Sequence, residues 1–167
     1  MFPNVSKSNY KPILDVCCGG RMFYFDKQNS DVVFCDNRQL DKTLIDGRVL
    51  EITPDVVADF RNLPFEDASF QMVIFDPPHL RKAGEKSWLA MKYGVLPAMG
   101  WRDYLGQGFR ECWRVLRPGG TLIFKWNEHQ IKISRLSRGG VFPDAPIFGT
   151  RTRYETMFLV FYKSEDQ

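Results

Sequence analysis

Short, continuous runs of apolar residues recur along the chain, and no other feature of the sequence restricts its fold as strongly. Each run is rich in β-branched and aromatic residues and is too short for a buried helix, which predicts a strand. Strands that are apolar throughout are typical of a parallel sheet with both faces covered. Such runs occupy residues 13–17, 32–35, 56–58, 71–75, 121–125 and 157–162, and a short extra strand is expected at 145–148.

Helices are expected in several gaps between these strands. Apolar side chains from Trp101 to Leu116 recur at helical spacing, and Pro118-Gly119-Gly120 ends that pattern. Residues 21–28 and 127–136 are predicted to be helical as well. This alternation predicts an α/β fold, a doubly wound and mostly parallel sheet with helices on both faces. A length of 167 residues suits one domain, so residues 1–167 are expected to form a single unit.

Composition and charge narrow the class of protein. No stretch approaches the roughly 20 apolar residues that cross a bilayer, and no secretion signal is recognisable, so a cytoplasmic protein is expected. The four cysteines lack the spacing of a zinc site, and no metal is expected. Residues 1–76 carry 8 Lys/Arg against 12 Asp/Glu, a balance of −4, whereas residues 77–167 carry 15 against 8, a balance of +7. A basic half suits a nucleic-acid partner, and an ordinary solvated surface explains it equally well.

Small and acidic residues follow the predicted strands. Ligands of doubly wound sheets bind outside the carboxyl ends of the strands, which makes these positions candidates for a site. Asp15 precedes a turn with Gly19 and Gly20, where glycine lets the backbone approach a ligand closely. Asp36 follows the second strand, 21 residues after Asp15. That spacing is near the one expected for an acid that accepts hydrogen bonds from ribose hydroxyls.

This order of motifs resembles the class I methyltransferases, and in particular small bacterial and prophage members, which take a methyl group from S-adenosylmethionine. The similarity extends from about Ile13 to Tyr162, although Cys17 and Arg21 stand where the family often has glycine. The resemblance implies that Asp59 accepts a hydrogen bond from the adenine amine of the cofactor. The full set of cofactor-binding residues that it implies is Asp15, Cys17, Gly19, Gly20, Asp36, Asn37, Asp59, Phe60 and Asp76.

A second motif, Asp76-Pro77-Pro78-His79, follows the fourth strand. It resembles the motif of methyltransferases that modify exocyclic amines of nucleobases, and it implies that these four residues are catalytic. Such an amine is a weak nucleophile because its lone pair is delocalised into the ring. The Asp76 carboxylate and the Pro77 carbonyl would accept its hydrogens and draw the nitrogen toward a tetrahedral geometry, while the prolines hold the loop in place.

The fourth residue of this motif leaves two roles open. His79 stands where the family usually has an aromatic residue that stacks on a flipped base, and an imidazole can stack or take up the released proton. A basic, aromatic loop follows the motif, and a lysine ends the fifth strand; both would contact the substrate backbone. The expected substrate-binding residues are His79, Arg81, Lys82, Lys86, Trp88 and Lys125.

The sequence therefore favours a methyltransferase that acts on a nucleobase amine, adenine N6 first, in DNA or RNA. One alternative is a methyltransferase for a small molecule or a protein. Another is a module that binds S-adenosylmethionine without turnover. The chain has no room for a separate sequence-recognition domain, so weak specificity, recognition of a folded RNA or help from a protein partner would each fit.

Overall fold

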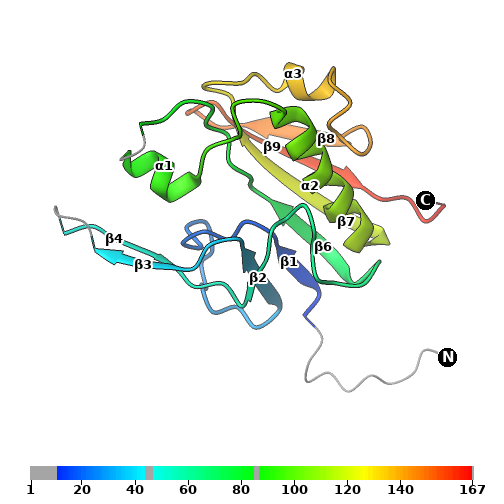
Figure 1. Cartoon of the computed structure of the whole chain (residues 1–167). Coiled ribbons are helices and arrows are strands. Elements are labelled where there is room, and N and C mark those ends of the chain that lie inside the picture. Colours follow the sequence, from blue (N-terminus) through cyan, green and yellow to red (C-terminus); the bar gives the residue numbers. More distant parts are fainter. Residues whose placement is uncertain (1–10, 44–46, 85–86, 167) are drawn as a thin grey trace.

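The computed structural model describes residues 11–43, 47–84 and 87–166. Seven strands form one sheet in the order β5-β2-β1-β6-β7-β9-β8, and a separate antiparallel hairpin pairs β3 with β4 (Figure 1). Neighbouring strands from β5 to β7 run parallel, whereas the pairs β7–β9 and β9–β8 are antiparallel. The predicted doubly wound, mostly parallel sheet is confirmed. The strands are β1 (Ile13–Asp15), β2 (Val32–Asp36), β3 (Leu40–Thr43), β4 (Val49–Ile52), β5 (Val56–Val57), β6 (Phe70–Phe75), β7 (Leu116–Asn127), β8 (Phe148–Arg151) and β9 (Thr156–Tyr162), and the helices are α1 (Trp88–Tyr93), α2 (Trp101–Val115) and α3 (Ser134–Ser137).

The strand order reverses at the centre of the sheet, between β1 and β6. Ile13 of β1 lies opposite Val32 of β2 on one side and opposite Met72 of β6 on the other, with both pairs parallel. The chain first proceeds outward through β2 to β5 and then returns to β6 on the other side of β1. The loops that leave β1 and β6 therefore diverge, and a crevice opens at the carboxyl ends of the strands. This is the position at which open α/β sheets bind their ligands.

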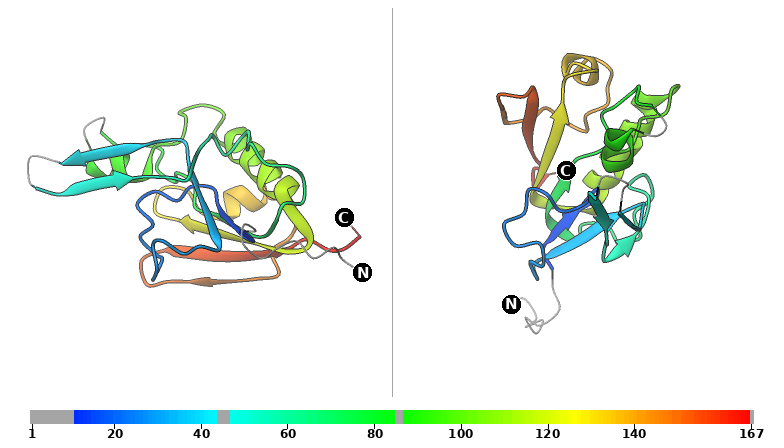
Figure 2. Two further views of the ribbon diagram at one scale, coloured as in Figure 1. Left: turned by 90° about the horizontal axis from the view of Figure 1, so that it is seen from below. Right: turned by 90° about the vertical axis from the view of Figure 1, so that its left-hand side faces the viewer.

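Helix α2 covers one face of the sheet (Figure 1, Figure 2). Its apolar stripe includes Leu105, Phe109 and Cys112, all fully buried, so the predicted amphipathic helix is confirmed. Gly108 lets the helix approach Phe60 closely, because a Cβ at this position would lie 2.5 Å from Cδ2 of Phe60.

Within the described ranges, no helix is both long enough and apolar enough to span a membrane.

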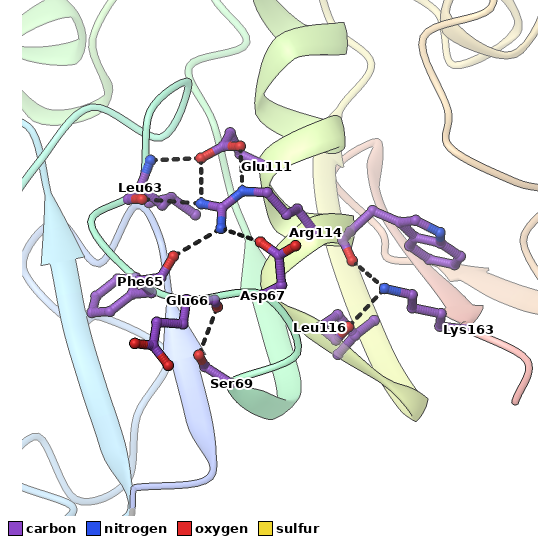
Figure 3. Close-up of polar contacts among 10 residues, drawn as sticks. Leu63, Phe65, Glu66, Asp67, Ser69, Glu111, Arg114, Leu116 and Lys163 are labelled. Atoms are coloured by element: carbon purple, nitrogen blue, oxygen red, sulfur yellow. Dashed lines mark hydrogen bonds and ion pairs between the residues drawn. The ribbon is translucent and has the colours of Figure 1, made fainter. Parts of the chain in front are cut away.

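A network centred on Arg114 holds the loop before β6 against the carboxyl end of α2 (Figure 3). Arg114 donates to the two carboxylate oxygens of Glu111 at 2.7 and 2.8 Å and to Asp67 at 2.8 Å. It also donates to the Phe65 carbonyl at 2.8 Å, and Glu111 accepts the Leu63 N–H at 2.8 Å. Because Arg114 and Glu111 satisfy several backbone groups of this loop, the irregular segment keeps a fixed position beside the core.

Residues 21–28 form turns, so the helix predicted there is wrong. Arg21 has a φ of 53°, in the left-handed region, and Asp26 accepts a backbone N–H two residues along at 2.9 Å. Side chains that bond to nearby backbone in this way compete with helix formation. Tyr24 instead packs against Phe34, with ring centroids 4.9 Å apart. This loop, rather than a helix, covers the second face of the sheet beside β1 and β2.

Two other expectations need correction. Residues 127–136 contain only the short helix α3, because Asn127 continues β7 and its side chain accepts the N–H of His129 at 3.0 Å. The strand expected at 145–148 lies instead at β8, where its residues pair with β9.

The β3–β4 hairpin and α1 were not predicted. β3 is largely exposed, and β4 alternates exposed and buried residues, so neither strand contains a continuous apolar run. α1 has only six residues, none of them buried, which gives no helical apolar stripe to detect. The hairpin and α1 lie next to each other at one end of the molecule (Figure 1, Figure 2). They flank the crevice at the carboxyl ends of the strands.

Candidate active site

A cavity of about 370 Å³ occupies the crevice at the carboxyl ends of β1, β2, β6 and β7. Because the carboxyl ends of parallel strands meet at one edge of the sheet, residues far apart in the sequence come together there. Eleven of the residues predicted for the site line this cavity: Cys17, Gly19, Gly20, Asp36, Asn37, Phe60, Asp76, Pro77, Pro78, His79 and Lys125. Lining residues that no motif indicated include Met22, Phe23, Arg38 and Tyr104, and the lining also contains Lys92 and Tyr93.

The glycine loop after β1 is shaped by two carboxylates. Asp15 accepts the N–H of Cys17 at 3.1 Å, and Asp36 accepts the N–H of Gly19 at 3.0 Å. Gly19 has a φ of 48°, which favours glycine, and nothing lies within 4 Å of the place where its Cβ would be. The loop therefore presents bare backbone to the cavity, with open space in front of it.

Asp15 lies beneath this loop and does not line the cavity. Its side chain is fully buried and accepts a hydrogen bond from the Tyr24 hydroxyl at 2.9 Å. Burial raises the pKa of Asp15 to about 7, although the Tyr24 hydroxyl and the Cys17 N–H lower it. The predicted direct contact of Asp15 with a cofactor thus needs correction: the carboxylate sets the conformation of the loop that would make that contact.

Asp36 and Arg38 connect the glycine loop to α1. Asp36 is buried, and its second oxygen accepts the Arg38 backbone N–H at 3.0 Å and the Arg38 Nε at 3.1 Å. Arg38 also donates to the carbonyl of Met91 in α1 at 2.9 Å. Asp36 lines the cavity while accepting these bonds, so one carboxylate fixes the loop and faces the ligand space.

The predicted adenine pocket is only partly assembled. Phe60 and Tyr104 line the cavity with ring centroids 5.0 Å apart, edge to face. Asp59 does not line it, because its carboxylate pairs with Arg61 at 2.7 Å. The hydrogen bonds from Arg61 also lower the pKa of Asp59. Two rings therefore line the cavity where an adenine could pack. Asp59 would have to release Arg61 before its carboxylate could accept a hydrogen bond from the adenine amine.

The Asp76 carboxylate lies 2.5 Å from the Lys125 ammonium across the ends of β6 and β7. Both side chains are mostly buried, with 17% and 23% of their surfaces exposed. Burial raises the pKa of Asp76, while the charge and the hydrogen bond of Lys125 lower it. The structure thus places Lys125 against Asp76, the first residue of the Asp-Pro-Pro-His motif, a contact that the sequence did not predict.

His79 lies in an aromatic environment. Its ring centroid is 5.6 Å from that of Tyr93 and 6.2 Å from that of Trp126. Trp126 is fully buried and donates to the Ile131 carbonyl at 2.9 Å, so it forms part of the floor beneath His79. Burial lowers the pKa of His79 to about 4, which keeps the imidazole neutral at physiological pH.

Arg81 and Lys82, which follow the Pro-Pro motif, do not line the cavity. Arg81 donates to the Ala98 carbonyl at 3.2 Å, and the backbone N–H groups of Arg81 and Lys82 both donate to Gln130. Trp88 lines a neighbouring groove. Lys86 lies outside the described residues.

Within the ranges that the structure describes, no group of three or more His, Cys, Asp or Glu side chains is arranged to hold a metal ion.

Comparison with solved structures bears on the fold. A protein of Pyrococcus horikoshii OT3 superposes with a TM-score of 0.56 at 18% identity, over 91% of this chain and 81% of that chain. A protein of Methanococcus maripaludis, described as an S-adenosyl-L-methionine-dependent methyltransferase, superposes with a TM-score of 0.50 at 14% identity, over 93% of this chain and 78% of that chain. The chain has the fold of the class I methyltransferases. No protein-family model matches the sequence, and no curated protein matches it.

Proposed function

We propose that this protein is a methyltransferase that uses S-adenosylmethionine to methylate an exocyclic amine of a nucleobase, adenine N6 first, in DNA or RNA. One observation carries the proposal: the Asp76-Pro77-Pro78-His79 motif lines the same cavity as the glycine loop and Asp36. A methyl donor and an acceptor amine held there would share one cavity. The two signals from the sequence thus describe two halves of one site.

The residues of the cavity fit S-adenosylmethionine. A volume of about 370 Å³ falls within the range of small-molecule pockets. The open backbone at Gly19 permits close approach of a ligand, and Asp36 and the Phe60 ring both line the cavity. When bound, the cofactor supplies an electrophilic methyl group.

The residues of the acceptor side would activate the amine without a strong base. The Asp76 carboxylate and the Pro77 carbonyl accept its two hydrogens, and Lys125 favours the ionised form of Asp76 that can do so. The nitrogen lone pair is then directed into the cavity rather than into the ring. As the new C–N bond forms, one N–H proton becomes acidic, and Asp76 is the first group able to receive it.

His79 is expected to act by stacking, because a ring with a pKa of about 4 is a weak base at neutral pH. His79→Phe should retain activity, whereas His79→Ala should weaken substrate binding by about 1 to 3 kcal/mol, the value of a base–aromatic stack. Since the pKa is lowered, kcat/KM should show no step near pH 6.5 that belongs to His79. If the pH profile of the wild type has such a step and His79→Phe is inactive, the residue takes up the proton instead.

Two measurements test the proposed function in sequence. Titration calorimetry of the purified protein with S-adenosylmethionine should give micromolar binding, about −8 kcal/mol. Mass spectrometry of nucleosides from DNA and RNA should then detect a methylated base only in cells that produce the protein. The absence of binding heat from folded protein would refute the proposal that the cavity binds S-adenosylmethionine. Normal binding of S-adenosylmethionine without any methylated nucleoside would refute the proposal that a nucleobase is the methyl acceptor.

A further inference from the structure

A second groove adjoins the catalytic cavity. It has a volume of about 400 Å³ and lies between the loop after β1, the β3–β4 hairpin and α1. Gly19, Gly20, Met22 and Lys92 line both spaces, so the groove and the cavity meet at the glycine loop and at α1. A ligand larger than the cavity could therefore extend from the reacting centre into the groove.

The charge of the groove suits an anionic ligand. Its lining contains Arg21, Lys27 and Lys92 against one carboxylate, that of Glu51. Arg21 is buried, donates to the Lys27 and Thr53 carbonyls at 2.6 Å each and pairs with Asp55 at 3.6 Å, so it holds the wall of the groove, and the positive charge offered to a ligand comes from the two lysines. The two lysines are the flexible cations, and phosphates bind to such side chains without strict geometry.

The far wall of the groove provides a stacking surface. The Arg48 guanidinium lies over the ring of Trp88, 4.5 Å from its centroid, and joins the hairpin to α1. Unstacked bases pack on tryptophan rings and on arginine planes. Met22, with 65% of its surface exposed at the boundary between groove and cavity, adds an apolar edge. The groove thus combines cations with a tryptophan ring, the two kinds of group found in sites for single-stranded nucleic acid.

We propose that this groove binds the nucleotides next to the target base of a single-stranded DNA or RNA segment, with Lys27 contacting phosphate and Trp88 stacking on a flanking base. This inference rests on the proposed function, and it assigns a specific role to the hairpin and α1. The substrate strand would cross from the groove into the cavity at the glycine loop.

The test measures anisotropy of fluorescently labelled single-stranded DNA and RNA oligonucleotides with the full chain in the presence of S-adenosylhomocysteine. Lys27→Ala should weaken binding several-fold and reduce the slope of log affinity against log salt by about 0.7, the loss of one phosphate contact to a single strand. Trp88→Ala should weaken binding by roughly tenfold, and Trp88→Phe should recover most of it. Lys132→Ala is the matched control, because Lys132 is exposed, pairs with Glu155 at 3.2 Å and lines neither the groove nor the cavity, and it should bind like the wild type.

The outcomes separate this inference from the function on which it rests. Equal affinity of the wild type, Lys27→Ala and Trp88→Ala would overturn the groove assignment, and so would a duplex that binds as well as a single strand. If no variant, including the wild type, methylates any nucleoside or oligonucleotide, the proposed function itself fails. The tighter of the two labelled oligonucleotides identifies DNA or RNA as the substrate.

Discussion

Replacing Asp76 by alanine is expected to reduce methyl transfer by about a hundredfold to a thousandfold, the range observed when one preorganised polar group at a reacting centre is removed. The carboxylate lines the cavity beside the Pro-Pro motif and would be the group that accepts a hydrogen of the target amine. Its loss would be felt mainly in the transition state, so kcat should fall while the affinity for S-adenosylmethionine changes little. Single-turnover transfer of a labelled methyl group, together with calorimetry of cofactor binding, measures both quantities.

A matched control excludes a general effect of losing a carboxylate. Asp103 lies on the exposed side of α2, 69% exposed and 3.7 Å from Arg110, and Asp103→Ala should keep full activity. Asp76→Asn, which retains one acceptor oxygen without the charge, should fall between the wild type and Asp76→Ala. Full turnover of Asp76→Ala on its substrate would rule out the amine-holding role.

The sheet and α2 were predictable because their signals do not depend on distant contacts. Buried parallel strands such as β2 and β6 must be apolar on both sides, and α2 must present a continuous apolar stripe to the core. The segment 21–28 contains helix-compatible residues, but Asp26 bonds to nearby backbone and Tyr24 reaches the buried Asp15. The contact between Tyr24 and Asp15 joins residues that are separated along the sequence, and such contacts have no local pattern.

The site was predictable to the extent that its residues stand directly at the ends of strands. Gly19, Asp36 and Asp76 meet because parallel strands bring their carboxyl ends to one edge. Arg38 and Tyr104 line the same cavity without any motif, because their positions depend on α1 and α2. The sequence could not show that Asp59, a predicted cofactor-binding residue, pairs with Arg61 and does not line the cavity. Nor could it show that Lys125 lies against Asp76.

Replacing Lys125 by methionine is expected to remove most activity at neutral pH and to restore part of it as the pH rises. Methionine keeps much of the length of lysine but removes the charge that opposes the effect of burial on Asp76. The pKa of Asp76 should therefore rise further, and a protonated carboxyl group donates a hydrogen bond where the reaction needs an acceptor. Lys125→Arg keeps a positive charge and should retain the pH profile of the wild type around neutrality.

The stability of Lys125→Met should change with pH in the opposite direction to its activity. A carboxyl group whose pKa is raised in the folded protein contributes stability below its unfolded value, about 3.9, and loses that contribution as the pH rises through the folded value. The free energy of unfolding of Lys125→Met, from urea titrations across this pH range, should therefore fall while kcat/KM increases. Asp15 also has a raised pKa and gives the wild type a trend of the same kind, so an additional fall in the free energy of unfolding relative to the wild type, opposite to the rise in kcat/KM, would identify Asp76 as the group that titrates in both measurements. If activity is lost equally at every pH while cofactor affinity is unchanged, Lys125 acts instead on the substrate, as expected for the phosphate contact that the sequence indicates.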